Sequence, residues 1–285
     1  LPCLDLSSVG RVRLWLTHVM LTSLAPRLVA LLSFAFMLVM NVLATTLPLN
    51  GQATNEISDR YDTLFAPIGF TFAIWGVIYL LLGVYTVVQL VADNAVIRAI
   101  TPWFIASNLL NGLWIVAWHY EQLWVAALII AALLWTLIFI NKHTTAARTT
   151  VGSTLAIRVP FAVYFGWVTV ATVANISALL VQFGLAEGFV LSAEAWTITI
   201  LVVAVGIGST TALVNSSPTY ALVLVWAFWG ILSRHLSATE WDSAYPSIIL
   251  TVQILLPVLA LVTLGALVRW LRLPVTELPT KSLKG

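Results

Sequence analysis

Eight long apolar stretches constrain this chain more than any other feature of its sequence. A helix needs about 20 mostly apolar residues to cross the hydrocarbon core of a bilayer. The stretches that reach or approach this length are 28–48, 66–91, 101–118, 122–141, 159–182, 196–214, 217–233 and 246–268. Hydrophobic residues make up 61% of the 285 residues and charged residues 8%, unlike soluble globular domains. We therefore predict an all-α, polytopic integral membrane helix bundle of about eight transmembrane helices, with the lipid bilayer as its surroundings.

The basic residues predict the orientation of this bundle, because cytoplasmic flanks of membrane helices carry an excess of lysine and arginine. With the N-terminus inside, the outer segments hold only Arg60 and Arg234. The inner segments hold Arg11, Arg13, Arg27, Arg98, Lys142, Arg148, Arg158, Arg269, Arg272, Lys281 and Lys284. We expect both termini to be cytoplasmic, and the cell (plasma) membrane to be the location. The net charge of +2 reflects this topology, and no basic patch for nucleic acid is present.

Three segments lie outside the apolar stretches and need separate interpretation. Residues 1–26 are expected to form an N-terminal cytoplasmic tail, either an interfacial amphipathic segment or an extension ahead of a start at Met20. The polar, net acidic segment Asn50 to Leu64 either folds over the mouth of a cavity or is a solvated connector. Residues 273–285 are expected to form a second cytoplasmic tail.

Three of the predicted helices each carry aromatic side chains on one face, two of them together with amides. Phe72, Trp75 and Tyr79 follow Pro67 at the spacing i, i+3, i+7, which aligns them along one side of a helix. An amide that faces hydrocarbon has no partner, so the asparagines on the other two faces should point inward. The remaining members of the three faces are Asn108, Asn111, Trp114 and Trp118, and Tyr164, Trp167, Ala171 and Asn175. We expect all twelve residues to converge beneath the acidic loop as a ligand-binding site. An occluded core without a cavity is the alternative.

These motifs resemble the TspO/MBR family of tryptophan-rich sensory proteins, which includes the mitochondrial translocator protein. The family's second helix has a proline-aromatic entry and then Phe, Trp and Tyr, like Pro67, Phe70, Phe72, Trp75 and Tyr79. Its third helix matches Leu110, Asn111 and Trp114, and its fifth matches Tyr164, Trp167, Ala171, Thr172 and Asn175. The chain departs from the family pattern where Ile68 follows Pro67 and where Val163 replaces a proline.

The resemblance covers residues 28–182 and implies a domain division. Residues 27–183 would form a five-helix membrane domain like that of the family, and residues 184–272 would add three helices. The resemblance implies that the chain binds, and transports or senses, a hydrophobic small molecule such as a tetrapyrrole (porphyrin) or a sterol-like lipid. A homodimer is one assembly that we expect.

The absence of ionisable residues from the apolar stretches reduces the number of function classes that fit the sequence. None of them contains Asp, Glu, Lys, Arg or His, which argues against a proton-relay transporter. His18, His119, His143 and His235 are scattered, so no metal site is expected, and Cys3 alone makes no internal disulfide. We expect no cofactor other than a tetrapyrrole bound as ligand. Two alternatives stay open: an enzyme that degrades a bound porphyrin under light, and a structural or assembly protein without a ligand.

Overall fold

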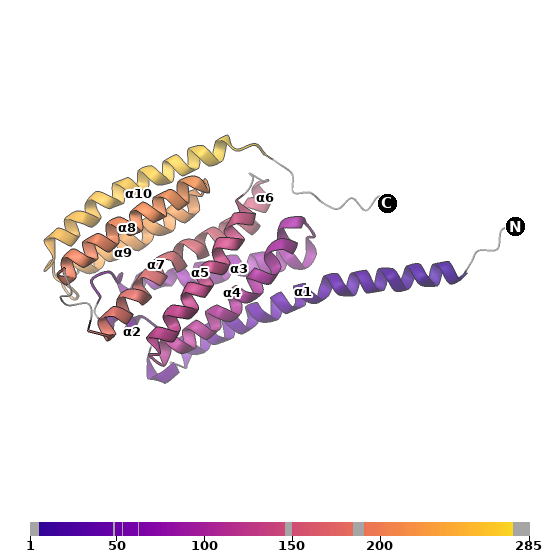
Figure 1. The fold of residues 1–285 in the computed structure, drawn as a ribbon, viewed down its shortest axis with the longest axis horizontal. Helices are drawn as coiled ribbons and strands as arrows, with labels where there is room; N and C mark the ends of the chain where they lie inside the picture. Colours follow the sequence, from indigo (N-terminus) through magenta and orange to yellow (C-terminus); the bar gives the residue numbers. More distant parts are fainter. Residues whose placement is uncertain are drawn as a thin grey trace.

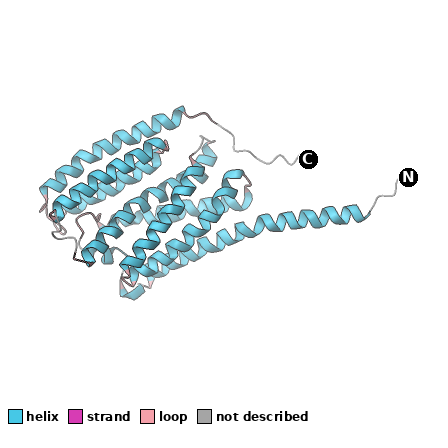
Figure 2. Cartoon of the chain, viewed as in Figure 1, coloured by secondary structure: helices cyan, strands magenta, loops and turns pink. Residues whose placement is uncertain are grey.

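The computed structural model describes residues 6–47, 49–52, 54–61, 63–145, 150–184 and 191–275, with side chains from Leu24 onward except that of Asn55. Within these residues the chain is built of helices (Figure 2). The two interpretations of residues 1–26 depend on side chains that lie outside the described part. The helix α1 runs from Leu6 to Thr46, and Figure 1 shows its N-terminal half projecting beyond the bundle. The tail after Val275 also lies outside the described residues.

Eight helical segments are long and apolar enough to span a membrane, which confirms the predicted fold class. The first span is Leu24–Thr46 of α1, and the second joins a short 3-10 turn, η2 (Gly69–Ala73), to α3 (Ile74–Val91). The others are α4 (Ala95–His119), α5 (Leu123–Thr144), α7 (Val159–Gln182) with its preceding turns, α8 (Ala193–Val214), α9 (Pro218–Leu236) and α10 (Pro246–Arg272). The short third and seventh stretches both belong to complete helices.

The helices extend beyond the apolar stretches, so charged residues predicted to lie in loops are part of them. Arg98 lies in the second turn of α4, and Arg234 lies in the last turn of α9. Arg158 ends η3 (Thr154–Arg158), a π-helical turn that follows α6 (Val151–Ser153). Its buried Nη2 donates to the carbonyls of Asn215 and Ser216 at 2.9 and 2.7 Å. Hydrogen bonds to backbone carbonyls thus offset the cost of burying the Arg158 guanidinium, as a charged group at membrane depth requires.

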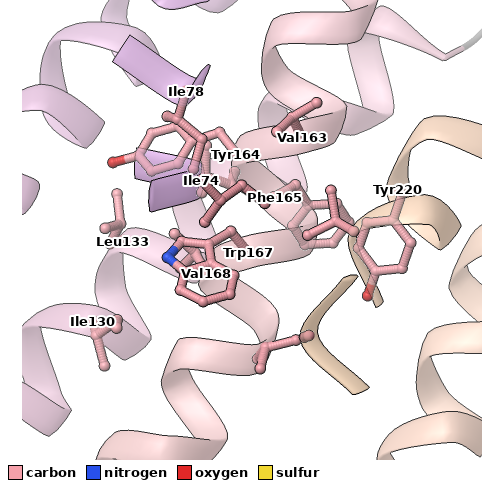
Figure 3. Close-up of a cluster of buried hydrophobic side chains, with 14 of the residues drawn as sticks. Ile74, Ile78, Ile130, Leu133, Val163, Tyr164, Phe165, Trp167, Val168 and Tyr220 are labelled. Atoms are coloured by element: carbon pink, nitrogen blue, oxygen red, sulfur yellow. The ribbon is translucent and has the colours of Figure 1, made fainter. Parts of the chain in front are cut away.

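The helix α7 lies at the centre of the bundle. It packs against α5, α3 and α9, and α4 in turn packs between α1 and α5. Figure 3 shows side chains of α7 (Val163, Tyr164, Phe165, Trp167 and Val168) among residues of α3, α5 and α9. Within the most apolar part of each span, 56% of the residues are buried in α7 and also in α9, against 17% in α10. The hydrophobic core therefore follows α7 and its neighbour α9, and α10 lies at the periphery.

The last three helices form a unit that is joined to the others through α9. Both α8 and α10 pack against α9, which packs against α7 (Figure 1). A Cβ at Gly166 of α7 would meet the Val223 Cβ at 2.9 Å and the Tyr220 carbonyl oxygen at 3.2 Å. The close approach of α7 and α9 therefore depends on a glycine.

Candidate functional site

Trp75 of α3 is the centre of an aromatic cluster drawn from three helices. Its ring stacks on Tyr79 at a centroid distance of 5.7 Å. It lies 5.9 Å from the Trp114 ring of α4, and 6.1 and 6.3 Å from the Tyr164 and Trp167 rings of α7. These distances and tilted or edge-on angles are typical of favourable aromatic pairs. The i, i+3, i+7 spacing seen in the sequence thus brings three helices into contact.

The cluster encloses a small cavity towards one end of the bundle, which we call the aromatic chamber. Phe72 of η2 meets Trp167 edge-on at 5.9 Å, and Trp114 stacks on Trp118 at 5.9 Å. The cavity volume is about 30 Å³. Its lining residues are Thr54, Ser58, Pro67, Phe72, Trp75, Trp114, Trp118, Trp167, Val170, Ala171, Ala174 and Asn175. A space of this size holds about one water molecule.

A chain of neutral hydrogen bonds lies behind the chamber and links four helices. The Tyr79 hydroxyl donates to Asn41 Oδ1 at 2.6 Å, and Asn41 Nδ2 donates to Asn111 Oδ1 at 2.8 Å. Asn111 Nδ2 then donates to the Tyr164 hydroxyl oxygen at 3.0 Å. The chain connects α3, α1, α4 and α7 in turn. Satisfied polar networks of this kind fix the relative positions of membrane helices, because the alternative is an unpaired group in hydrocarbon.

The two remaining amides among the predicted site residues, Asn175 and Asn108, have other hydrogen-bond partners. Asn175 Oδ1 accepts from the Trp114 indole nitrogen at 3.0 Å, and its Nδ2 donates to the Ala171 carbonyl at 2.9 Å. Asn108 Nδ2 donates to Ser33 Oγ at 3.1 Å, between α4 and α1. In contrast, the buried indole nitrogen of Trp167 has no hydrogen-bond partner among the described residues. A buried donor without a partner is unusual in a native protein.

Eight of the twelve sequence-predicted site residues line the chamber, and four do not. Those that line it are Pro67, Phe72, Trp75, Trp114, Trp118, Trp167, Ala171 and Asn175. Tyr79, Asn111 and Tyr164 belong to the hydrogen-bond chain, and Asn108 lies apart from both. Sequence reasoning missed Asn41, although it is the one amide within the first apolar stretch. It also missed Thr54 and Ser58. Both lie in a polar connecting segment, where no local pattern distinguishes lining residues from solvated ones.

The acidic segment folds over the chamber, and we call the described residues between 52 and 68 the cover. Its helix α2 (Thr54–Arg60) follows the 3-10 turn η1 (Leu49–Gly51). The Thr54 carbonyl accepts from the Trp118 indole nitrogen at 3.1 Å. Glu121, in the α4–α5 turn, accepts from the Tyr61 hydroxyl at 2.9 Å and from Gln52 at 3.4 Å, and pairs with Arg60. The cover is therefore bonded to the α4 end of the chamber, and it is not a solvated connector.

Electrostatics at Glu121 favour the bonded arrangement near neutral pH. Burial alone would raise the pKa of the Glu121 carboxyl. The hydrogen bonds from Tyr61 and Gln52 and the charge of Arg60 outweigh this effect and hold that pKa below its ordinary value of 4.5. Burial, and then the hydrogen bond to Glu121, raise the pKa of Tyr61 to about 12. Glu121 is thus ionised and Tyr61 is neutral over the physiological range.

The helix α9 holds the cover and η2 from the opposite side. The Ile68 backbone N–H donates to the Gly230 carbonyl at 3.1 Å, and the Trp226 indole nitrogen donates to the Thr71 carbonyl at 3.0 Å. Phe70 packs edge-on against Trp229 at 5.0 Å. These contacts join residues more than 150 positions apart in the sequence.

Arg234 supplies the charged part of this α9 contact. The side chain is 3% exposed and pairs with Asp59 of the cover at 3.2 Å and with Glu240 at 3.2 Å. It also lies over the Trp241 ring, 5.7 Å from its centroid. A guanidinium this buried is tolerated because two carboxylates compensate its charge.

The described lining of the chamber combines aromatic and apolar surface with a few neutral polar groups. Among the described residues, this lining includes no carboxylate, imidazole, amine or thiol, and its polar groups are amides, hydroxyls and indole N–H groups. Such a lining suits a flat, mostly apolar molecule that takes one or two hydrogen bonds.

Comparison with known proteins is consistent with this architecture. A family described as TSPO-like protein matches the chain over residues 27–265. The match extends beyond residues 28–182, which carry the sequence resemblance, through α8 and α9 and most of α10. Neither a curated protein nor a solved structure gave a significant match. Because the family match spans most of the sequence, the chain belongs to the TSPO-like protein family.

Proposed function

We propose that this membrane protein binds a flat, largely apolar small molecule in the aromatic chamber, of the tetrapyrrole or sterol-like class. The observation that carries the proposal is the convergence of four indole side chains from three helices, Trp75, Trp114, Trp118 and Trp167, on one cavity. The unpaired N–H of Trp167 adds a donor for a ligand oxygen or nitrogen. The resemblance to TspO implies the same ligand class.

Binding of such a ligand requires the chamber to open. Pockets for small molecules typically enclose about 300–1,000 Å³, against about 30 Å³ in this structure. The hydrogen-bond chain through Asn41 and Asn111 restrains the helical walls behind the chamber. The cover contributes Thr54, Ser58 and Pro67 to the lining and is held through polar contacts at its edges. We infer that the ligand enters by displacing the cover, at the end of the bundle that carries α2.

The closed chamber also favours a second candidate function. A structural or assembly protein would need an occluded aromatic core and no ligand, and the small cavity volume fits that role. Light-driven breakdown of a bound porphyrin is a third possibility from the resemblance. Product formation under light would distinguish it from binding alone.

The test is a titration of the purified full-length protein in detergent with protoporphyrin and, separately, with cholesterol. Quenching of tryptophan fluorescence and a shift of the porphyrin absorption band report binding. Stacking on an aromatic ring contributes about 0.5–1.5 kcal/mol beyond area burial, so Trp167→Ala should weaken binding at least several-fold. Trp167→Phe keeps a ring for stacking and removes only the N–H without a partner, so it should weaken binding less than Trp167→Ala. The matched control is Trp135→Ala, because Trp135 is 60% exposed on α5 and does not line the chamber.

A second variant keeps all the tryptophans. Ala171→Phe fills the chamber from α7, and it should abolish binding in a protein that still unfolds cooperatively. Equal effects of the Trp167 and Trp135 variants would assign binding to another surface. Absence of binding by the unmodified protein for both ligands would favour the structural role.

The orientation in the membrane is part of the proposal. Among the described residues, Arg27 lies near the start of the first span, and Arg98, Lys142, Arg158, Arg269 and Arg272 lie near helix ends at the same side of the bundle. The cover lies at the other side with Glu121 and Glu240. We propose that the basic end is cytoplasmic in the cell membrane and that the cover faces outward. Reporter fusions after Gly285 and within the cover should report opposite sides, and the same side for both would reject this orientation.

A further inference from the structure

A second and much larger cavity lies between α1 and α4, at the basic end of the bundle. Its volume is about 310 Å³, about ten times that of the aromatic chamber. The lining residues are Pro26, Arg27, Asp93, Ile97, Arg98, Thr101, Pro102 and Ile105. None of them belongs to the chamber or the cover. The proposed function therefore gives this cavity no role.

The polar end of the cavity carries an excess positive charge. One carboxylate, that of Asp93, forms an ion pair with Arg27 Nη2 at 3.2 Å and accepts from Arg98 Nη1 at 2.7 Å. Arg27 Nη1 also donates to the Leu90 carbonyl at 3.1 Å. Two guanidiniums against one carboxylate leave one net positive charge. Each guanidinium has five N–H donors, so the contacts among the described residues leave donors for a second anion.

Burial distinguishes the two arginines. The Arg27 side chain is 14% exposed, whereas that of Arg98 is 50% exposed. Arg27 is fixed between the ends of α3 and α4, so it is preorganised. Arg98 is accessible and can turn towards a ligand without a large loss of its own hydration.

The rest of the cavity is mostly apolar and follows α4 towards the middle of the membrane; the Thr101 hydroxyl donates to the Ile97 carbonyl within the helix. Ile97, Thr101 and Ile105 are spaced i, i+4, i+8, so they lie along one side of the helix. Eight residues of helix span about 12 Å at 1.5 Å per residue. The cavity thus combines a cationic head region at the helix ends with an apolar slot of about two turns. This is the shape of an amphiphile with an anionic head.

We propose that the α1–α4 cavity binds an anionic phospholipid of the surrounding bilayer. The lipid phosphate would lie against Arg27 and Arg98, and one acyl chain would follow Ile97 and Ile105. Basic pockets between membrane helices on the cytoplasmic side are suited to anionic head groups. A zwitterionic lipid carries the same phosphate with a cation attached, and the excess positive charge disfavours it. Inorganic phosphate lacks the chain that fills the apolar slot.

The test compares lipids on the full-length protein purified in a neutral detergent. Bound lipid is counted by native mass spectrometry after incubation with phosphatidylglycerol or phosphatidylcholine, and the thermal unfolding midpoint is measured in parallel. We expect phosphatidylglycerol to be retained and to raise the midpoint more than phosphatidylcholine does. The attraction of one basic side chain to an anionic membrane is worth about 1 kcal/mol, or roughly a fivefold change in binding. Arg98→Gln should therefore reduce phosphatidylglycerol retention about fivefold.

Two further variants separate the cavity from general electrostatics. Arg272→Gln removes the same charge at the same end of the bundle, but on α10 and away from the cavity, and should leave retention nearly unchanged. Ile105→Trp fills the apolar slot without changing any charge, and it should lower retention of the lipid. Inorganic phosphate at the same concentration should give little shift in the unfolding midpoint.

Several outcomes would overturn the proposal. Equal losses for Arg98→Gln and Arg272→Gln would mean that the attraction is diffuse. Equal retention of the two lipids by the unmodified protein would mean that no anionic site exists. A phosphate shift as large as the lipid shift would assign the site to a free anion. None of these readouts depends on ligand binding in the aromatic chamber, so the two proposals fail independently.

Discussion

The Arg234 guanidinium on α9 lies 3.2 Å from the Asp59 carboxylate on α2. A residue of the last three-helix unit thus holds the cover of the aromatic chamber. Arg234 is almost completely buried, whereas the Asp59 side chain is 39% exposed. The hydrogen bonds from Ile68 to Gly230 and from Trp226 to Thr71 reinforce the same connection. Helices α8–α10 contribute no residue to the described lining of the chamber, yet α9 is bonded to the cover that closes it.

Loosening this ion pair should free the cover without unfolding the bundle. Asp59→Asn leaves Arg234 with Glu240 as a charged partner, so we expect a loss of about 1 kcal/mol or less of stability, as for partly exposed pairs. Amide hydrogen exchange over residues 57–66 should become several-fold faster. Asp242→Asn, the same change in the α9–α10 turn, serves as the control. Unchanged exchange in the Asp59 variant would show that the ion pair does not restrain the cover.

Gly230 tests the steric side of the same contact. A Cβ at this position would meet Thr71 Oγ1 at 2.3 Å, Thr71 Cγ2 at 2.8 Å and Pro67 Cβ at 3.0 Å. Gly230→Ala should therefore force η2 away from α9 and destabilise the protein by about 1–3 kcal/mol, as overpacking typically does. Gly206→Ala on α8 is the matched control, because its Cβ would meet nothing within 4 Å. That substitution should be neutral or stabilising, and equal unfolding midpoints for the two variants would contradict the packing argument.

Acid should release the cover through Glu121. The folded-state pKa of this carboxyl is below its ordinary value, so its contribution to stability is fully present above about pH 4.5 and is lost as the pH falls through the lowered pKa. The thermal unfolding midpoint should decline below pH 4.5, and less so in Glu121→Gln. Glu194→Gln, at the same end of the bundle on α8, should retain the decline of the unmodified protein. A parallel acid response in the Glu121→Gln and unmodified proteins would exclude Glu121 as the titrating group.

Much of the fold could be predicted from the sequence because the bilayer imposes a length on every span. The cost of an unpaired amide in hydrocarbon placed two of the three aromatic faces inward, since Asn111 and Asn175 would otherwise lack partners. Helix periodicity then brought Trp75, Trp114 and Trp167 together. These inferences are local: each needs only a few turns of one helix.

The rest depended on relationships that no local pattern encodes. The contact of Trp226 with Thr71 joins distant parts of the chain, and nothing around either residue indicates the other. The volume of the chamber depends on how closely side chains interlock, where a shift of one methyl group matters. Asn41 is an intermediate case. A lone amide in an apolar stretch indicates that it has a hydrogen-bond partner, but the sequence does not show which residue that partner is.

The partner of Asn41 leads to the last prediction, which concerns the hydrogen-bond chain behind the chamber. Asn41 and Asn111 are bonded at 2.8 Å, and each also bonds to a tyrosine, Tyr79 or Tyr164. Asn111→Leu leaves groups on Asn41 and Tyr164 without this partner, so it should destabilise the bundle by about 1–3 kcal/mol. Asn41→Leu should act similarly. Because the pair shares one bond, the double variant should lose less than the sum of the two single losses.

A double-mutant cycle in lipid bicelles, with unfolding by a denaturing detergent, measures that difference. Hydrogen bonds between membrane helices average about 0.6 kcal/mol and reach about 1.7 kcal/mol in such cycles, so the coupling between Asn41 and Asn111 should fall in this range. The matched cycle pairs Asn41→Leu with Asn175→Leu, because Asn175 bonds to Trp114 and Ala171 instead. Its effects should add within about 0.3–0.5 kcal/mol. Additive effects in the first cycle as well would mean that the two amides do not act together to fix the wall of the chamber.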